Sequence, residues 1–424
     1  MTEKIVKCRI CGNERLLDIF NLGEQSLASQ FPAPDEPDPM KAPLHLVKCD
    51  DKENHSRCGL LQLSHTVASK NLYSHKYGYR SGINSTMPRH LEGLVREIEE
   101  RIDLQDNDIV VDIGSNDCTL LKAYSEDVIL RKIGIDPIGS KFLAYYPKHI
   151  HLSPHFFSKK VYRSQFGEKQ ARVVTSISMF YDLPDPLMFA KDVKAILADD
   201  GIWVTEQSYC VTMIEKTSFD TICHEHLEYY TFKQIAFIAH AAGLQIVDVS
   251  LNECNGGSFR ISMTHKDNDR IPIRSESIAS LVKKEEDLAL HTLVPLHAFV
   301  ERCQARKDAL MSFLTEQKNI GKSIYIYGAS TKGNTLLQYY GLDNSLITAA
   351  AERNPDKYGC RTPHTNIPIV DEKTMRDANP DFLLVLPWHF RDEFVARETE
   401  YIESGGTLIF PLPTVNFYSQ KKKH

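Results

Sequence analysis

Two histidines and two carboxylates stand close together in the segment 223–228 (Cys-His-Glu-His-Leu-Glu). The segment lies downstream of a strand-like run, on the side of an α/β sheet where ligands bind. A neutral imidazole accepts a proton at pH 7, and a nearby carboxylate stabilises the charged ring. We therefore interpret His226 as a general base oriented by Glu225 or Glu228. The alternatives are a structural polar network and a metal site, although His-x-His-x-Glu lacks the histidine spacing of zinc hydrolases.

A second chemical signal is an apolar run ending at Gly114, followed 22 residues later by an acidic residue, Asp136, at the end of the next run. This pattern binds nucleosides, because a glycine lets the backbone approach the ligand and the acid takes both ribose hydroxyls. The single glycine and the charge of Asp117 disfavour a pyrophosphate. We expect S-adenosylmethionine, with an ordinary α/β turn as the alternative. The expected cofactor residues are Asp112, Gly114, Asn116, Asp117, Asp136 and Ser178.

Four of the ten cysteines lie within the first 58 residues, as Cys8-x-x-Cys11 and Cys49-x8-Cys58. The segment 1–70 contains little that could form a large apolar core, and a bound structural zinc would supply the missing folding energy. We predict a four-thiolate zinc site, with His55 replacing one thiolate as a variant and unrelated reduced thiols as the alternative. Four protein ligands leave no open position, which disfavours a catalytic zinc.

Composition bounds the class of protein. The chain has 424 residues, 42% hydrophobic and 25% charged, which predicts two or three folded domains. A net charge of -6 gives no general attraction to nucleic acid or an anionic membrane. No apolar run reaches 18 residues and the first residues do not resemble a signal peptide, so we expect a cytoplasmic protein with no membrane partner.

The hydrophobic pattern predicts an α/β fold. An amphipathic helix is expected over 87–104, and Pro295 should kink or split the helical linker 275–319. The last two central strands should form an antiparallel hairpin at the sheet edge. The expected parts are a zinc module (1–70), a Rossmann-like methyltransferase domain (71–268), and a linker with a C-terminal Rossmann-like domain (269–424). Strands are predicted over 109–114, 131–136, 171–178, 201–207, 244–251, 257–265, 323–327, 382–388 and 407–413.

A third candidate site is the glycine loop 328–333, between a strand and a helix of the C-terminal domain. Its backbone amides, hydroxyls and lysine could hold a diphosphate, although its spacing is not that of a Walker loop. The substrate-binding candidates are Ser330, Thr331 and Lys332, with Lys216 and Arg260 as further phosphate ligands. The alternative is a purely structural turn.

The sequence resembles the sugar C-methyltransferases that act on nucleotide-linked 4-keto-6-deoxy sugars, over nearly the whole chain. The resemblance rests on the cysteine module, the histidine segment, and the motifs DIGSND (112–117), GGSFR (256–260) and YGASTKGNT (327–335). It implies a zinc-binding domain, a central S-adenosylmethionine domain, a C-terminal Rossmann-like domain, and methyl transfer to C3 of the sugar. It also implies that His226 is the catalytic histidine, that Glu225 assists it, and that Tyr77 or Tyr79 lies near the substrate.

Two positions depart from the better-known members of that family. Cys223 stands where they have a tyrosine, and Tyr181-Asp182 stands where they have a histidine. These changes affect which sugar and which carbon react, and they make Asp182 a second candidate for the base. Tyr79, Tyr77 or His224 is expected to donate to the enolate oxygen.

Two other functions stay open at this point. An NAD-dependent sugar-nucleotide oxidoreductase would use the C-terminal domain, but neither half of the chain contains Gly-x-Gly-x-x-Gly. A non-catalytic nucleotide-sugar-binding protein would not need the base and the cofactor residues together. The expected partner is a nucleotide-linked keto sugar, and the expected state is a monomer or a small homo-oligomer.

Overall fold

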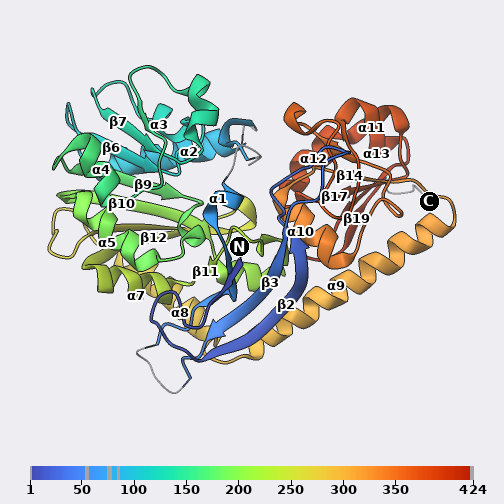
Figure 1. Cartoon of the computed structure of the whole chain (residues 1–424), viewed down its shortest axis with the longest axis horizontal. Helices are drawn as coiled ribbons and strands as arrows, with labels where there is room; N and C mark the ends of the chain where they lie inside the picture. The colour runs from blue at the N-terminus through green and yellow to red at the C-terminus, as the bar shows by residue number, and fades with distance from the viewer. Residues whose placement is uncertain (1, 53–56, 74–78, 84–85, 421–424) are drawn as a thin grey trace.

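The structure is a computed structural model that describes residues 2–52, 57–73, 79–83 and 86–420. Figure 1 shows a central α/β domain and a C-terminal α/β domain side by side, with the long N-terminal strands running between them. Each domain has its own sheet. The predicted α/β class is confirmed.

The N-terminal part contains a sheet with the strand order β11-β4-β3-β2, next to an antiparallel pair, β1 and β5. Its short final strand, β11, comes from the middle of the chain. Its apolar residues Phe20, Leu22, Leu44 and Leu46 are buried in a core shared with the C-terminal domain, which extends well beyond the N-terminal part itself. The strands are β1 Thr2–Lys4, β2 Leu16–Ser26, β3 Lys41–Cys49, β4 Leu61–Leu63, β5 His65–Val67 and β11 Glu228–Tyr229.

The central sheet has the strand order β12-β13-β10-β9-β6-β7-β8. The chain runs from β6 outward to β8 and then returns to place β9 on the other side of β6, so a topological switch point lies between β6 and β9. All five residues of β6 are buried, as expected for a parallel strand covered on both faces. The strands are β6 Ile109–Ile113, β7 Arg131–Ile135, β8 His151–Ser153, β9 Ala171–Ile177, β10 Leu197–Ser208, β12 Leu244–Asn252 and β13 Ser258–His265.

Helices cover this sheet, and short 3₁₀ helices line its carboxyl edge. The predicted amphipathic helix is α2, which buries Leu91, Leu94, Val95 and Ile98. The helices are α1 Ser69–Leu72, α2 Thr86–Arg101, α3 Thr119–Lys122, α4 Lys159–Phe166, α5 Pro186–Ile196, α6 Cys210–Glu215 and α7 Phe232–Ala242. The 3₁₀ helices near the site are η3 Phe180–Asp182, η4 Phe219–Thr221 and η5 Cys254–Gly256.

The predicted edge hairpin and the split linker are both confirmed. Strands β12 and β13 pair antiparallel, and η5 connects them. The linker consists of α8 (Ser275–Asp287) and α9 (Val294–Asn319), with Pro295 in the first turn of α9, where its missing amide costs no helical hydrogen bond. Within the described ranges, no helix is long and apolar enough to cross a membrane.

The C-terminal sheet has the strand order β16-β15-β14-β17-β18-β19, and only β19 runs antiparallel to its neighbour. The predicted glycine loop 328–333 does lie between β14 and a helix, but only 328–330 form the loop, because residues 331–333 are already the first turn of α10. The strands are β14 Ile324–Tyr327, β15 Ala350–Glu352, β16 Ile369–Asp371, β17 Phe382–Val385, β18 Thr407–Phe410 and β19 Asn416–Tyr418. The helices are α10 Thr331–Tyr340, α11 Glu372–Ala378, α12 Arg391–Arg397 and α13 Thr399–Glu403.

Candidate functional site

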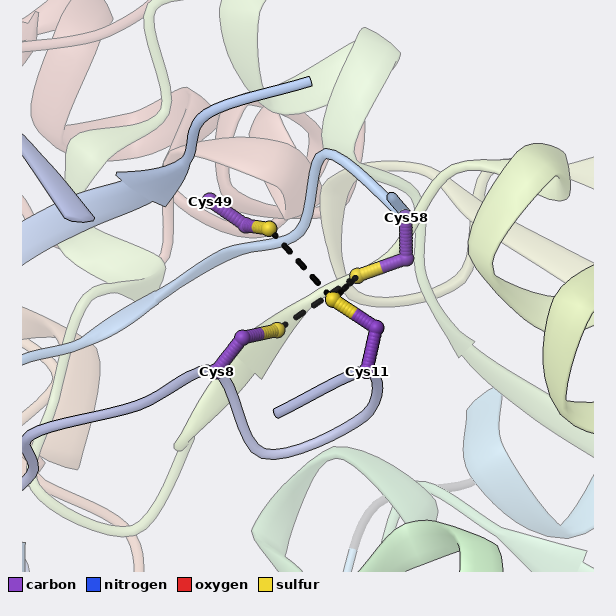
Figure 2. A group of neighbouring side chains, drawn as sticks. All are labelled: Cys8, Cys11, Cys49 and Cys58. Atoms are coloured by element: carbon purple, nitrogen blue, oxygen red, sulfur yellow. Dashed lines mark hydrogen bonds between the residues drawn. The ribbon is translucent and has the colours of Figure 1, made fainter. Parts of the chain in front are cut away.

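The four N-terminal cysteines converge, as Figure 2 shows. The Sγ atoms of Cys8 and Cys58 are 3.4 Å apart, those of Cys11 and Cys58 3.5 Å, and those of Cys11 and Cys49 3.6 Å. Sulfur ligands about 2.3 Å from a tetrahedral zinc lie roughly 3.8 Å from one another, so these thiolates fit the ion. The predicted four-thiolate site is confirmed as a cluster, and the variant ligand His55 lies outside the described residues.

The zinc module also holds the histidine segment. Strand β11 begins two residues after His226 and pairs with β4, and the amide of Leu63 donates to the carbonyl of Leu227 at 2.9 Å. His224 Nε2 lies 3.0 Å from the carbonyl oxygen of Ala42 in β3. A carbonyl only accepts, so Nε2 of His224 carries the proton. His224 is therefore tied to the zinc module.

A cavity of about 190 Å³ lies at the switch point between β6 and β9. Apolar side chains including Leu91, Ile138 and Phe156 form part of its wall. Gly114 has a φ of 79°, and a Cβ at this position would lie 3.1 Å from the Met179 side chain, so the turn requires glycine. Five of the predicted cofactor residues line the cavity, namely Asp112, Gly114, Asn116, Asp136 and Ser178.

The carboxylate of Asp136 is fixed by backbone amides. The amide of Asn116 donates to its Oδ2 and the amide of Ile138 donates to its Oδ1, both at 2.8 Å. Burial raises the pKa of Asp136, and these donors oppose the rise. Burial also raises the pKa of Asp112 to about 7, although Thr175 donates to it at 2.7 Å. Each Asp136 oxygen keeps acceptor capacity for a ribose hydroxyl.

Asp117, the sixth predicted cofactor residue, holds the loop in place. It accepts hydrogen bonds from the amide of Gly82 at 2.9 Å and from Thr119 Oγ1 at 2.6 Å. The backbone of Tyr79 also reaches this loop, where its carbonyl accepts from Asn116 Nδ2 at 3.4 Å. Tyr79 lines the cavity and is 44% exposed, whereas Tyr77 lies outside the described residues.

We expect Asp136→Ala to weaken S-adenosylmethionine binding by ~10- to 100-fold, because hydrogen bonds to a charged acceptor contribute about 1.5–3 kcal/mol. Isothermal titration calorimetry would measure the change in Kd. Asp103→Ala is the matched control, because Asp103 is exposed and does not line the cavity. Equal affinity of Asp136→Ala and the wild-type protein would place the ribose elsewhere.

The His226 ring is oriented by a backbone carbonyl. Its Nδ1 lies 2.7 Å from the carbonyl oxygen of Thr221 in η4, so Nδ1 carries the proton and Nε2 keeps a free electron pair. The Tyr181 ring packs on it with the ring centroids 4.3 Å apart. Among the described residues, neither Glu225 nor Glu228 hydrogen-bonds to this ring. The orienting role expected of these carboxylates therefore falls to Thr221.

The remaining polar residues of the histidine segment are buried. In the part of the chain that the structure describes, neither carboxylate oxygen of Glu225 has a hydrogen-bond partner, and Glu228 faces Arg9, whose Nε is 3.7 Å away. Burial, with Glu225 and Asp182 nearby, raises the pKa of the Cys223 thiol well above its ordinary value. Cys223 is therefore a neutral thiol in this environment.

The C-terminal domain closes over the same region. Lys332, in the first turn of α10, donates to the carbonyl of Asn255 in η5 at 2.6 Å. Trp388 Nε1 donates to Asp220 in η4 at 2.9 Å. Burial and the charge of Lys332 lower the pKa of His226 to about 3. His226, the candidate base, and Lys332 thus come from different domains, and the charge of Lys332 acts on the His226 imidazole.

The other substrate-binding candidates have protein partners. Ser330 caps α10, since its Oγ accepts from the amide of Gly333 at 3.0 Å, and Thr331 is the first residue of that helix. Arg260 is buried and bonded to Glu206 and Glu97. Lys216 is paired with Glu253. A phosphate role for Arg260 or Lys216 would therefore require breaking an ion pair.

Sequence reasoning missed several residues around the site. Tyr73 lines the cavity, and its hydroxyl donates to Asp182. Trp388 could have been noticed as one of only two tryptophans in the chain. The role of Thr221 had no sequence signal, because its contact uses a backbone oxygen.

Three family models match the chain in succession. They are "Putative zinc binding domain" over residues 8–73, "Methyltransferase domain" over 83–249 and "C-methyltransferase C-terminal domain" over 253–413. The first contains the four cysteines and the second contains the loop after β6. The third begins beside η5 and includes the whole of α10.

Comparison with individual proteins adds one relative that matches along the whole chain. The chain is 29% identical over 418 residues to the C-methyltransferase NovU of Streptomyces niveus, covering 96% of each sequence. Among solved structures, the mitomycin 7-O-methyltransferase MmcR matches 43% of this chain and 54% of its own, with 12% identity and a TM-score of 0.34. A LepI complex with S-adenosylmethionine matches 40% and 46%, with 17% identity and a TM-score of 0.33.

The family models and the NovU match agree with the chemistry of the site. Gly114 and Asp136, which are expected to hold S-adenosylmethionine, both line the cavity at the switch point, and the cysteine cluster fits zinc. The protein is an S-adenosylmethionine-dependent C-methyltransferase that carries a zinc-binding module.

Proposed function

We propose that the protein methylates C3 of a nucleotide-linked 4-keto deoxy sugar, in deoxysugar biosynthesis. The observation that carries this proposal is that His226 packs on Tyr181, next to Asp182 of the cavity wall, and lies within the electrostatic reach of Lys332. Its neighbour in space, Tyr181, belongs to η3, and Asp182 of the same turn lines the cavity. The charge of Lys332 also acts on the imidazole. A substrate with a reactive carbon near a base and an anionic group near a lysine fits this arrangement.

The residues of the chain supply what methyl transfer to carbon requires. S-adenosylmethionine provides an electrophilic methyl group, and carbon becomes nucleophilic only after loss of a proton next to a carbonyl. Nε2 of His226 accepts this proton, while Nδ1–H stays bonded to Thr221. Glu225, whose two oxygens have no hydrogen-bond partner among the described residues, is a second polar group for substrate hydroxyls.

Lys332 supports the nucleotide part of the proposal. It lies in the first turn of α10, where backbone N–H groups favour anions, and its ammonium group lies close enough to Asp220, His226 and His389 to influence the pKa of each. Burial is the main cause of the low pKa of His226, and a diphosphate bound here would neutralise the charge of Lys332, which lowers that pKa further. Substrate binding would thereby make His226 a stronger base.

We expect Lys332→Ala to raise the KM for the sugar nucleotide by ~10- to 100-fold, since it removes one charge-assisted contact of about 1.5–3 kcal/mol. The Kd for S-adenosylmethionine should not change. Lys322→Ala is the matched control, because Lys322 pairs with Asp381 at the opposite end of β14. A KM that is unchanged in Lys332→Ala would show that the diphosphate does not bind at α10.

The proposal is tested by incubating the enzyme with methyl-labelled S-adenosylmethionine and a panel of dTDP-, GDP- and CDP-linked 4-keto sugars. Mass spectrometry should find label in one sugar nucleotide, and NMR should place the new methyl group on C3. Label found on another carbon would correct the position. Label found in none of the sugars would contradict the substrate class.

An oxidoreductase function for the C-terminal domain has less support. Glu352 ends β15, where a ribose-binding acid would stand, but its Oε1 accepts from the amides of Arg353 and Asn354 at 2.8 and 3.0 Å. Lys357 pairs with its Oε2 at 3.3 Å and lies over the Phe31 ring. A ribose at this acid would therefore have to displace Lys357. A change in NADH absorbance on adding sugar nucleotide would revive this alternative.

A further inference from the structure

Asp182 and Tyr73 meet at the wall of the cofactor cavity. Asp182 ends η3, directly after β9, and Tyr73 directly follows α1. Both residues line the cavity, as Gly114 does. Strand β6 separates β9 from β7, so this pair lies across the crevice from Asp136. Asp136 is the expected ribose ligand, so the opposite side of the crevice, where Asp182 and Tyr73 lie, is available to the methyl acceptor.

The two oxygens of Asp182 differ in their surroundings. Tyr73 Oη donates to Oδ2 at 2.6 Å. Oδ1 is buried and has no hydrogen-bond partner among the described residues, although the residue as a whole keeps partial exposure at the cavity. An unpaired charged oxygen in such a position costs far more free energy than the oxygen of a neutral carboxyl.

The groups around Asp182 favour its neutral form. Burial and the nearby charge of Glu225 raise the pKa of Asp182 well above its usual range, against the hydrogen bond from Tyr73. The charge of Asp182 also raises the pKa values of Cys223, Glu228 and Tyr229, and all three of these groups are acids. Arg9 pairs with Glu228, and no described cation forms an ion pair with Asp182.

Hydrogen-bond polarity then fixes the position of the proton. A neutral carboxyl has one acceptor oxygen and one hydroxyl. With Tyr73 as the donor to Oδ2, as the structure assigns this hydrogen bond, Oδ2 is the acceptor and Oδ1 is the hydroxyl. The described protein offers Oδ1–H no acceptor, so this position is left to a group bound in the cavity.

We propose that Asp182, held by Tyr73, donates a hydrogen bond from Oδ1 to the carbonyl oxygen of the substrate and stabilises the enolate. This role rests on the proposed function and differs from the base role that the sequence left open for Asp182. When His226 removes the α-proton, the C–H electron pair forms the C=C bond and the carbonyl π pair moves to the oxygen facing Asp182. The enolate pair then forms the new C–C bond to the methyl group, the methyl–sulfur bond breaks with its electrons staying on sulfur, and His226 releases its proton to solvent.

Two substitutions of Asp182 distinguish a donor from a base. Asp182→Asn keeps a neutral donor of the same shape, so methyl transfer should stay within about tenfold of wild type. Asp182→Ala removes the donor and should lower kcat by ~10²- to 10³-fold, as for one oxyanion-hole donor. The Kd for S-adenosylmethionine, measured by calorimetry, should stay unchanged in both variants. Asp185→Asn is the matched control, because Asp185 caps α5, where asparagine caps equally well.

Each outcome bears on the proposal. Near-wild-type transfer by Asp182→Asn together with loss in Asp182→Ala supports it. An Asn variant that binds cofactor but transfers no better than the Ala variant overturns it and favours a carboxylate base. If the Ala variant fails to fold, the Asn variant decides alone, and a loss above 100-fold with intact cofactor binding counts against the donor. Absence of transfer by the wild-type enzyme overturns the proposed function and this role together.

Discussion

His226→Asn should lower the rate of methyl transfer by ~10²- to 10⁴-fold while leaving the binding of both ligands intact, because general base catalysis contributes a factor of that size. Asparagine can still donate to the Thr221 carbonyl, so the variant removes the basic nitrogen and keeps the hydrogen bond that orients it. Single-turnover assays would measure the rate and calorimetry the two Kd values. His240→Ala, in the exposed last turn of α7, is the control.

The pH dependence of the wild-type enzyme gives a second readout. The active base is the neutral imidazole, and burial lowers its pKa to about 3, helped by Lys332 and opposed by the Thr221 carbonyl. Activity that depends on His226 is therefore lost only as pH falls through that value. The profile of kcat/KM, which reports the free enzyme, should show no loss from His226 between pH 8 and about 5. An acid limb near pH 6.5 that disappears in His226→Asn would contradict this environment.

Removing the zinc ligands should have the largest structural effect. Replacing Cys8, Cys11, Cys49 and Cys58 by serine should abolish the binding of about one zinc per chain and unfold the N-terminal module. Structural zinc contributes about 10–16 kcal/mol in zinc-finger peptides, as much as the whole stability of a typical domain. Metal analysis and hydrogen exchange would measure both effects. Cys360→Ser, in the C-terminal domain, is the control.

The zinc variant should also lose methyl transfer, because the module supports the histidine segment. The pairing of β11 with β4 and the contact between His224 and Ala42 both depend on it. Hydrogen exchange should therefore rise in residues 223–229 as well as in β2 and β3. A quadruple variant that keeps its zinc, or one that loses zinc with unchanged exchange and activity, would contradict a structural role for the site.

The cofactor loop and the zinc ligands could be predicted because their signals are local. A buried strand, one glycine and an acid ending the next strand already place Gly114 and Asp136 at one sheet edge. Two cysteine pairs in a short segment likewise indicate the chemistry of their partner. Both inferences depend on residue type and spacing, which the sequence states directly.

The contacts that complete the site could not be predicted, because they join distant parts of the chain. Tyr73 and Asp182 are 109 residues apart, Asp220 and Trp388 168, and Ala42 and His224 182. No pattern of hydrophobicity or spacing encodes such pairs. If the N-terminal segment is a separate module, the apolar residues of β2 and β3 are too few to form a large core. In the structure these residues pack against the C-terminal domain, and this contact buries them.

The central claim, an enolate formed by His226 and methylated on carbon, is tested most directly by solvent deuterium exchange. Wild-type enzyme with the 4-keto sugar nucleotide and S-adenosylhomocysteine, which has no methyl group to transfer, should exchange the C3 proton for deuterium. His226→Asn should bind both ligands and exchange that proton at least ~10²-fold more slowly. Mass spectrometry and NMR of the recovered sugar would measure the rates. Wild-type exchange that His226→Asn retains in full would contradict the claim.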